Sequence, residues 1–512
     1  MNALVALPVV IPMIVGALSL ALWRSLPAQR ALGVLGTGAL LAASVWLLLT
    51  VAREGILVMH MGEWQGPFGI VLVADLLGAI MTVLGAITGF AVAVYSLATV
   101  GRAEEKFGYY PLLHLLLAGV SGAFLTGDIF NLYVWVEVLL VASFALLTLG
   151  GERAQMEGAI KYVTLNLLSS VLLLVAVGLT YGMFGTLNMA DLADKFGQTE
   201  EHGLITVIGM LFLISFSIKA AAFPFFFWLP ASYHTPHVAV SALFAGLLTK
   251  VGVYALFRFF TLMFDQDVGY THNLLLWIAG FTMLTGVLTA AAQSDVRKIL
   301  SFHIISQIGY MIVGLALYTP LALTGAVFYL IHNIIAKANL FLIAGIARRL
   351  TGSFDLNRIG GLFKAAPFLS ALFLVSALGL AGIPPLSGFW AKLLVVLAAL
   401  EVANWWIAGV SLGVGLLTLF SMTKIWQYAY WSPLPEGARL AERPSRLLYA
   451  PVVGLAALTL LLGVWSQPLI ALGDAAAAEL LDPSRYVAAV FGEAAPEAPP
   501  APPGAGLDGG AP

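Results

Sequence analysis

Long apolar segments recur through most of the chain and limit the folds that it can adopt. Between residues 3 and 466, nearly uncharged runs of about 20 residues are separated by short polar connections, and an α-helix needs about 20 residues to cross the hydrocarbon core of a bilayer. Because a bilayer offers the backbone no hydrogen-bond partner, and the alternating pattern of membrane strands is absent, we expect each segment to be a helix. The sequence therefore predicts an all-α integral membrane protein with about fourteen transmembrane helices. The expected helices are 3–22, 31–51, 71–98, 109–127, 129–149, 158–181, 204–222, 237–263, 273–292, 300–318, 321–346, 368–400, 406–430 and 447–466.

Composition excludes several classes of function. The chain is 61% hydrophobic and only 10% charged, with a mean hydropathy of +0.97, which excludes a soluble globular protein. It has no cysteine, so disulfides, iron–sulfur clusters and thiolate metal sites are excluded, and its eight histidines form no HxxxH or HExxH motif. We find no nucleotide-binding loop or arrangement of nucleophile and base. We therefore expect a transporter without cofactor, metal or nucleic-acid partner, and not an enzyme.

Lys and Arg are distributed unevenly between the two sides of these predicted helices. If the N-terminus is outside, most basic residues fall in inner loops, among them Arg24, Arg102 and Arg348, and few fall in outer loops. This asymmetry predicts a multi-pass protein of the bacterial cell membrane with both termini outside. Seven basic residues then fall within the predicted membrane segments and need individual explanations: Lys161, Lys219, Lys250, Arg258, Lys337, Lys392 and Lys424.

Two of these lysines flank a segment interrupted by proline. Lys219 and Lys250 lie in apolar runs on either side of AFPFFFWLPASYHTPHVAV, which contains Pro224, Pro230 and Pro236. A lysine at the centre of a membrane helix costs about 2.5 to 3.5 kcal/mol on insertion scales, so it indicates a functional site. Proline breaks a helix, and broken backbone in a membrane lines a cavity or is buried in protein. The pattern predicts a broken helix around residues 219–230 beside an ion-translocating site.

Glu137 lies near the middle of its predicted helix, where a carboxylate must face protein, water or a cation. We expect it to pair with a buried lysine and to tune the proton affinity of that lysine; the alternative is a fixed ion pair or a hydrogen bond between helices. Lys161 and Lys424 lie near helix ends and are expected to reach the interface. Arg258 cannot deprotonate and is expected to be structural, as is Asp75 near the outer surface.

Polar residues also form stripes on two consecutive predicted helices. Residues 303, 306, 307 and 310 share one helix face, and residues 329, 333 and 337 share a face of the next. Single residues of this kind are more often satisfied core groups, but two adjacent stripes favour a hydrated proton path. The stripes consist of His303, Ser306, Gln307 and Tyr310, and of Tyr329, His332, Asn333 and Lys337.

A second interruption, GLAGIPPLSGFWA, precedes Lys392 and predicts another broken helix around residues 382–392. Corresponding interruptions in two halves of a chain are typical of transporters built from repeats. The sequence therefore predicts an internal duplication.

Several stretches resemble a known family: DIFNLYVWVEVLLVASFALL, FPFFFWLP, SALFAGLLTKVGVYALFR, SDVRKILSFHIISQIGYM, HNIIAKANLFLIAG and GIPPLSGFWAK. They are similar to the antiporter-like subunits shared by respiratory complex I, membrane-bound hydrogenases and Mrp-type multisubunit cation/proton antiporters, and most similar to the D subunits of the Mrp type. The length of the sequence argues against two other subunit types, for which we would expect a long C-terminal extension: the Mrp A subunits and the complex I subunit with a lateral helix.

The resemblance implies fourteen helices that contain two inverted five-helix repeats. It assigns Glu137 to the fifth helix, Lys219 to the broken seventh, Lys250 to the eighth and Lys392 to the broken twelfth, and it makes Lys337 with His332 the central relay. Ala231 departs from the family pattern, which has an acidic residue after WLP, and so any proton uptake through that acid is in doubt. The implied organisation is 1–127 for the N-terminal helices, 109–263 and 273–430 for the two repeats, 447–490 for the last transmembrane helix with an outer helix, and 492–512 for a disordered tail.

Two functional hypotheses follow from the resemblance. The first is a proton-translocating subunit of a multisubunit sodium/proton antiporter that works with the A, B, C, E, F and G subunits. The second is a proton-pumping subunit of complex I or of a membrane-bound hydrogenase, in which electron transfer elsewhere drives the protons. The two differ in partners and share one mechanism within this chain. Because sodium prefers several oxygen ligands and acidic residues are scarce in these membrane segments, we expect the sodium route mainly in a partner subunit.

Overall fold

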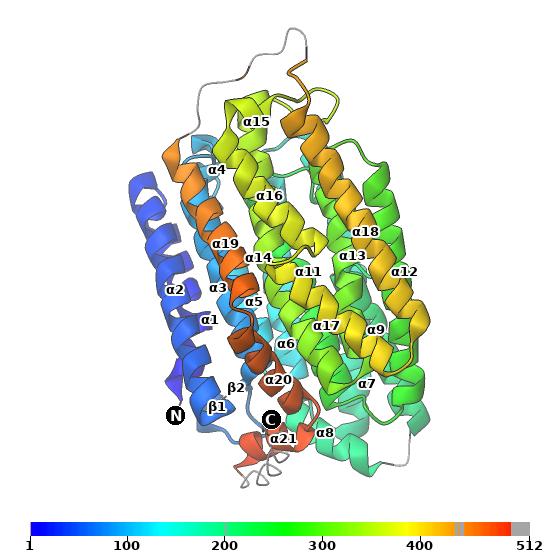
Figure 1. The fold of residues 1–512 in the computed structure, drawn as a ribbon. Coiled ribbons are helices and arrows are strands. Elements are labelled where there is room, and N and C mark those ends of the chain that lie inside the picture. Colours follow the sequence, from blue (N-terminus) through cyan, green and yellow to red (C-terminus); the bar gives the residue numbers. More distant parts are fainter. Residues whose placement is uncertain (1, 200–201, 436–439, 441–444, 493–512) are drawn as a thin grey trace, which may run out of the picture.

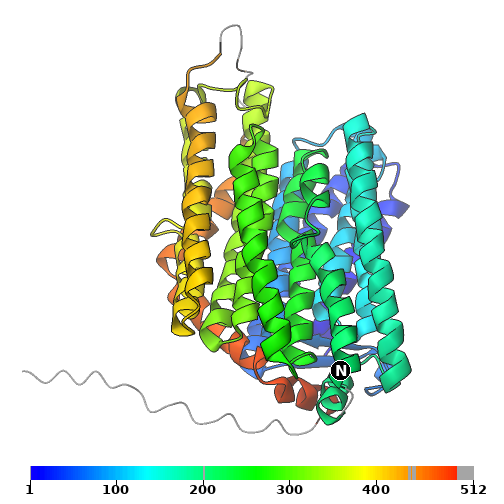
Figure 2. The same cartoon turned by 90° about the vertical axis from the view of Figure 1, so that its right-hand side faces the viewer.

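The computed structural model describes residues 2–199, 202–435, 440 and 445–492. These residues form a bundle of long helices that run side by side (Figure 1), and a view from the side shows the same arrangement (Figure 2). The longer helices are α1 (Leu7–Ala21), α2 (Leu26–Glu54), α3 (Leu76–Ser96), α5 (Tyr109–Leu125), α6 (Ile129–Thr148), α7 (Arg153–Phe184), α9 (His202–Ala220), α11 (Val238–Leu262), α12 (Val268–Ala292), α13 (Val296–Leu317), α14 (Pro320–Thr351), α16 (Pro367–Ala381), α17 (Ser387–Glu401), α18 (Trp405–Ile425), α19 (Arg446–Val464) and α20 (Gln467–Leu480). The shorter elements are β1 (Leu57–His60), β2 (Val71–Ala74), α4 (Arg102–Lys106), α8 (Met189–Gln198), α10 (Trp228–Ser232), α15 (Leu362–Ala365) and α21 (Pro483–Phe491).

The predicted all-α membrane architecture is confirmed. Among the described residues, eleven helices are long and apolar enough to cross a membrane, and three shorter apolar helices accompany them: α1, α5 and α16. The expected count of fourteen crossings remains a prediction, because these three have fewer than eighteen residues. The two inverted repeats also remain a prediction.

One end of the bundle carries the N-terminal residues, both strands, α8 and α21, and we call it the terminal end (Figure 1). There β1 pairs antiparallel with β2, with Leu57 opposite Ala74. The predicted start of a helix at residue 71 is therefore wrong. Asp75 follows the strand and caps α3, because its Oδ1 accepts the N–H of Gly78 at 2.9 Å.

The end of the chain also differs from the prediction. The single outer helix expected before residue 492 is instead the second half of α20 followed by the separate helix α21, which begins at Pro483. The tail predicted to be disordered lies outside the described residues, apart from Gly492.

Burial is greatest at the centre of the bundle. The most apolar stretch of α11 is 100% buried, and those of α13 and α14 are 94% buried, whereas the corresponding stretches of α2 and α7 are 39% buried. The outer helices expose large apolar side chains, such as Ile160 and Val171 on α7. Exposed apolar surface on this scale is suited to lipid, so the central helices hold the groups that must be kept from it.

Both predicted interruptions are present. α9 ends at Ala220, one residue after Lys219, and regular helix resumes at Trp228; likewise, α16 ends at Ala381 and α17 begins at Ser387. The residue after each first half has a left-handed backbone, with φ of 58° at Ala221 and 91° at Gly382. These interruptions end two helices beside buried lysines.

Candidate functional site

Lys219 is held at the broken end of α9 by helix α7. Its side chain is buried, and Nζ donates to the carbonyl oxygen of Asn166 and to Oγ of Ser170, each at 3.1 Å. Both partners were missed in the sequence, although residues 166, 169 and 170 form a polar stripe at helical spacing that could have indicated them. The partners are neutral, so they fix the ammonium in place without neutralising it.

Glu137 lies on α6, partly buried, and no described residue forms a hydrogen bond with its Oε1. The expected direct pair with a buried lysine is therefore absent: the described residues contain no salt bridge between Glu137 and Lys219. The negative charge of the carboxylate still acts on the Lys219 ammonium over a longer distance. Glu137 thus influences Lys219 through space, without a direct ion pair.

Lys250 lies in the middle of α11 and is completely buried. Its Nζ donates to the carbonyl oxygen of Ala245 on the same helix at 2.6 Å, whereas an ammonium has three N–H donors. α11 comes very close to the end of α9: a Cβ at Gly252 would lie 2.5 Å from the nitrogen of Ala220. This close approach places the helix of Lys250 against the residue that follows Lys219.

Lys337 lies on α14, fully buried, and its Nζ donates to the carbonyl oxygen of Leu300 on α13 at 3.3 Å. The charges of Lys250 and Lys392 both act on it. Among the described residues, both ring nitrogens of His303 and both side-chain polar atoms of Asn333 lack a hydrogen-bond partner. Buried polar groups are normally hydrogen-bonded, so Lys337 lies among groups with unused bonding capacity.

The two polar stripes face each other across α13 and α14. Tyr329 donates a short hydrogen bond to Oε1 of Gln307, whose Nε2 donates to Oγ of Ser306 at 3.2 Å. The ring of Tyr310 stacks on Tyr329 with centroids 4.9 Å apart, and its hydroxyl donates to the carbonyl oxygen of Ser411 on α18. The structure therefore brings Ser306, Gln307, Tyr310 and Tyr329 together, whereas the proton path that the stripes favour stays a prediction.

Further polar contacts lie at the second broken helix. Nδ1 of His332 lies 2.8 Å from Oγ of Ser387, at the start of α17. Nζ of Lys392 donates to the carbonyl oxygen of Ala381, at the end of α16, at 2.8 Å, and it lies 5.4 Å from the centroid of the Tyr310 ring. Lys392 is only partly buried and lines a groove of about 450 Å³ between α16, α17 and α18. In the series Glu137, Lys219, Lys250, Lys337 and Lys392, the first and last members are thus the partly accessible ones.

The remaining basic residues have separate environments. Lys161 is exposed and pairs with Glu157 at 2.6 Å, one helical turn away. Lys424 donates to the carbonyl oxygens of Ala291 and Gln293, at 3.1 and 2.7 Å, where α12 ends. Both lie outside the buried set, in line with their expected place near helix ends.

Comparison with known proteins identifies the family. Residues 126–418 match the family model described as NADH:quinone oxidoreductase/Mrp antiporter, transmembrane. The D subunit of the Na⁺/H⁺ antiporter of Alkalihalophilus pseudofirmus is 48% identical over 493 residues, which is 96% of this chain and 100% of the relative. A chain in the structure of the Mrp complex from Dietzia sp. has a TM-score of 0.89 and 34% identity, covering 96% of this chain and 100% of its own.

A chain of the membrane-bound sulfane sulfur reductase, an archaeal respiratory complex, has a TM-score of 0.88 and 26% identity, with the same coverage. The identity to the antiporter D subunit is higher and extends over almost the whole chain, as the sequence motifs predicted. The chain therefore belongs to the NADH:quinone oxidoreductase/Mrp antiporter family of transmembrane proteins, within its group of Mrp antiporter D subunits.

Proposed function

We propose that this chain is a proton-translocating membrane subunit of a multisubunit sodium/proton antiporter, a secondary transporter without chemistry of its own. The observation that carries the proposal is the bonding of four lysines: Lys219, Lys250 and Lys337, which are buried, and Lys392, which is partly buried. Among the described residues, their Nζ atoms donate only to neutral groups. A lysine that served only to hold the fold would be neutralised by a carboxylate, because an uncompensated buried charge is costly. A lysine without such a partner can release its proton.

Electrostatic repulsion couples the lysines. Lys337 feels the charges of both Lys250 and Lys392, so a proton on either neighbour makes a proton on Lys337 less favourable. A proton that arrives at one end therefore lowers the affinity at the next position. His303, Asn333 and the Tyr329–Gln307–Ser306 chain lie beside this series and offer hydrogen-bonding groups to water that would connect it. Glu137, Lys219, Lys250, His332, Lys337 and Lys392 are the proposed proton-translocation residues.

The two ends of the set support a multisubunit assembly. Glu137 and Lys392 are both partly accessible from the side of the bundle, where neighbouring membrane subunits would contact them. The partners we propose are the A, B, C, E, F and G subunits, as in Mrp-type antiporters, and the likeness to a chain of the Mrp complex supports this. We propose that the sodium route lies mainly in a partner subunit.

The proposed topology places the terminal end outside the cell. The opposite end, with α4 and α15 (Figure 1), carries basic residues at the ends of its helices, including Arg30 near the start of α2, which pairs with Glu105 at 2.8 Å, and Arg348 and Arg349 in the last turn of α14. Basic connections stay on the cytoplasmic side. Both termini would then be outside a bacterial cell membrane, and residues 109–263 and 273–430 would form the two repeats.

A redox-driven pump is the second candidate, supported by the likeness to a chain of the sulfane sulfur reductase. Purification from native membranes distinguishes the candidates, because antiporter subunits copurify in one case and redox subunits in the other. Liposomes with a pH-sensitive dye and an imposed sodium gradient then test transport. We expect sodium-driven proton flux from the purified assembly and none from this chain alone. Flux at the rate of the whole complex from the single chain would contradict the proposed need for partners, and redox subunits in the purified assembly would contradict the antiporter.

A further inference from the structure

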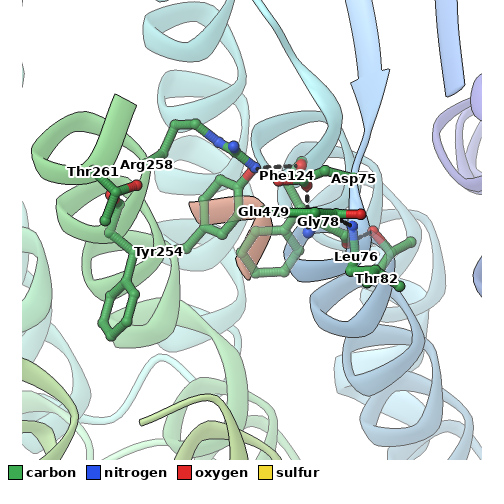
Figure 3. Close-up of polar contacts among 10 residues, drawn as sticks. Asp75, Leu76, Gly78, Thr82, Phe124, Tyr254, Arg258, Thr261 and Glu479 are labelled. Carbon is green, nitrogen blue, oxygen red and sulfur yellow. Dashed lines mark hydrogen bonds and ion pairs between the residues drawn. The ribbon is translucent and has the colours of Figure 1, made fainter. Parts of the chain in front are cut away.

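Three elements meet in a buried charged cluster near the terminal end: the start of α3, the last turns of α11 and the end of α20 (Figure 3). Nη2 of Arg258 lies 2.6 Å from Oδ2 of Asp75, and their side chains are only 5% and 3% exposed. Oε2 of Glu479 accepts the backbone N–H of Leu76 at 2.9 Å. This N–H is the first of α3, where a helix favours negative charge.

The cluster holds two carboxylates and one guanidinium from these three elements. Asp75 is neutralised directly by Arg258, whereas Glu479 has no salt bridge among the described residues. The nearby Arg485 pairs with Asp482 at 3.1 Å. Glu479 therefore remains the carboxylate without its own cation, next to the negative charge of Asp75.

Burial and the charge of Asp75 together raise the pKa of Glu479 to about 7, while the N–H of Leu76, Arg258 and Arg485 act in the opposite direction. Tyr254 and Tyr486 also lie near the Arg258 guanidinium, and the charge of Asp128 acts on Tyr486. A carboxyl group of this kind changes its protonation near neutral pH.

A second observation indicates a ligand in this region. The ring of Tyr486 covers Arg258, with the guanidinium carbon 5.1 Å from the centroid, and the residue is only 4% exposed. Its hydroxyl oxygen has no hydrogen-bond partner among the described residues. A buried hydroxyl normally bonds to protein or water, so a water molecule or proton carrier beside the guanidinium would satisfy it.

The cluster lies on the same face of α11 as the central lysine. Lys250, Tyr254 and Arg258 are spaced at i, i+4 and i+8, which places them one above another. Nη2 of Arg258 donates to the hydroxyl of Tyr254 at 3.1 Å, and this hydroxyl donates to the carbonyl oxygen of Phe124 at 2.7 Å. Eight residues of helix span about 12 Å, which is the axial separation of Lys250 from the cluster.

We propose that Glu479, positioned by Asp75 and Arg258, is the proton-exchange group through which this chain communicates with water at the terminal end. The inference rests on the proposed function. Glu479 is only partly buried, in contrast to Asp75 and Arg258, so it lies between the surface and the buried pair. In exchange, one carboxylate oxygen takes a proton from outside water and gives it to water on the Lys250 side, or the reverse. Arg258 keeps its own proton and contributes only a fixed positive charge.

The test measures sodium-driven proton exchange by the complete assembly in oriented membrane vesicles. The pH on the terminal side is varied from about 6 to about 9 while the pH on the opposite side is held fixed, and in a second series the two sides are exchanged. This range brackets the pKa of a group that titrates near neutral pH. For Glu479→Gln, which can still accept the N–H of Leu76, we expect the dependence on terminal-side pH to disappear and the rate to fall at least tenfold. The dependence on the pH of the opposite side should be unchanged. Glu479→Asp should restore a dependence on terminal-side pH.

Asp474→Asn is the matched control, because it removes another carboxylate of α20. Oδ1 of Asp474 accepts a hydrogen bond from Oγ1 of Thr324 at 2.7 Å. This variant should leave both pH profiles unchanged. The inference is overturned if Glu479→Gln keeps the wild-type dependence of exchange on the pH of both sides. It is also overturned if Asp474→Asn changes the terminal-side dependence as much as Glu479→Gln does. If Glu479→Gln does not assemble, Glu479→Asp is the deciding variant. A dependence on terminal-side pH identical to that of the wild type overturns the inference, and a shifted dependence supports it. The proposed function fails separately, if Glu137→Ala and Lys219→Ala both keep normal exchange.

Discussion

Gly252 on α11 lies against the backbone of Lys219 on α9. A Cβ at residue 252 would come within 2.8 Å of the Lys219 carbonyl carbon and within 2.5 Å of the following nitrogen. Only glycine permits this approach, because backbone atoms cannot move aside as a flexible side chain can. The contact fixes the broken end of α9 relative to the helix that carries Lys250.

Gly252→Ala should therefore separate the two lysine-bearing helices. Overpacking of this kind costs about 1 to 3 kcal/mol, so we expect a lower melting temperature of the purified assembly and several-fold slower exchange. Gly178→Ala on α7 is the control, because a Cβ there would meet nothing within 4 Å. Equal melting temperatures and rates for both variants would contradict the packing argument.

Glu137→Ala and Lys219→Ala should each abolish exchange while the protein still inserts. Loss of the Lys219 ammonium leaves Oγ of Ser170 and the carbonyl oxygen of Asn166 without their donor, at a cost of about 1 to 3 kcal/mol, so insertion is checked by expression in the membrane. Lys161→Ala on the exposed face of α7 should exchange normally. Normal sodium and proton exchange in well-expressed Glu137→Ala or Lys219→Ala vesicles would refute their assignment.

Arginine should not replace the relay lysines. In Lys250→Arg and Lys337→Arg the positive charge remains, but guanidinium does not release its proton, so we expect exchange to stop. Lys424→Arg should remain active, because Lys424 lies outside the proposed relay and a guanidinium can also donate to the carbonyl oxygens of Ala291 and Gln293 at the end of α12. Retained exchange in either relay variant would show that those sites need only a fixed charge.

Ser387 should orient His332. Its Oγ lies 2.8 Å from Nδ1 of the ring, and this bond selects which ring nitrogen carries the proton. Ser387→Ala should slow exchange several-fold and shift its pH profile, whereas the stability should change by only about 1 kcal/mol. Ser387→Thr keeps a hydroxyl and should retain most of the activity. A pH profile identical to wild type for Ser387→Ala would exclude this role.

The sequence predicted the membrane helices well, because their length and apolar character follow from the thickness of the bilayer. It also predicted the interruptions after Lys219 and before Lys392, since proline and glycine act locally on the backbone. It did not predict the strand at Val71, because that strand exists only through its pairing with β1, whose His60 lies opposite. Long-range pairing leaves no local signal in an apolar run.

The chemistry of individual side chains was harder to predict. The spacing of the stripes correctly indicated that Tyr329 and Gln307 lie on facing sides of two helices, but it could not show that Lys219 bonds to Asn166 and not to Glu137. Glu479 was missed altogether. Glu479 lies in the alanine-rich stretch DAAAAELL, which is typical of a surface helix. The burial of its side chain depends on how α20 packs against α14 and α3. Such contacts become visible only in the folded structure.

Lys337 provides the most direct test of the central claim, that protons pass through this chain along its buried lysines. Lys250 and Lys392 both act on it electrostatically, so its loss should interrupt the proposed relay. Sodium-driven proton flux is measured in liposomes that contain equal amounts of complete assembly with wild-type chain or Lys337→Ala. The account predicts that the variant lowers the flux to that of protein-free liposomes while the assembly stays intact. Wild-type flux from intact Lys337→Ala assembly would contradict it.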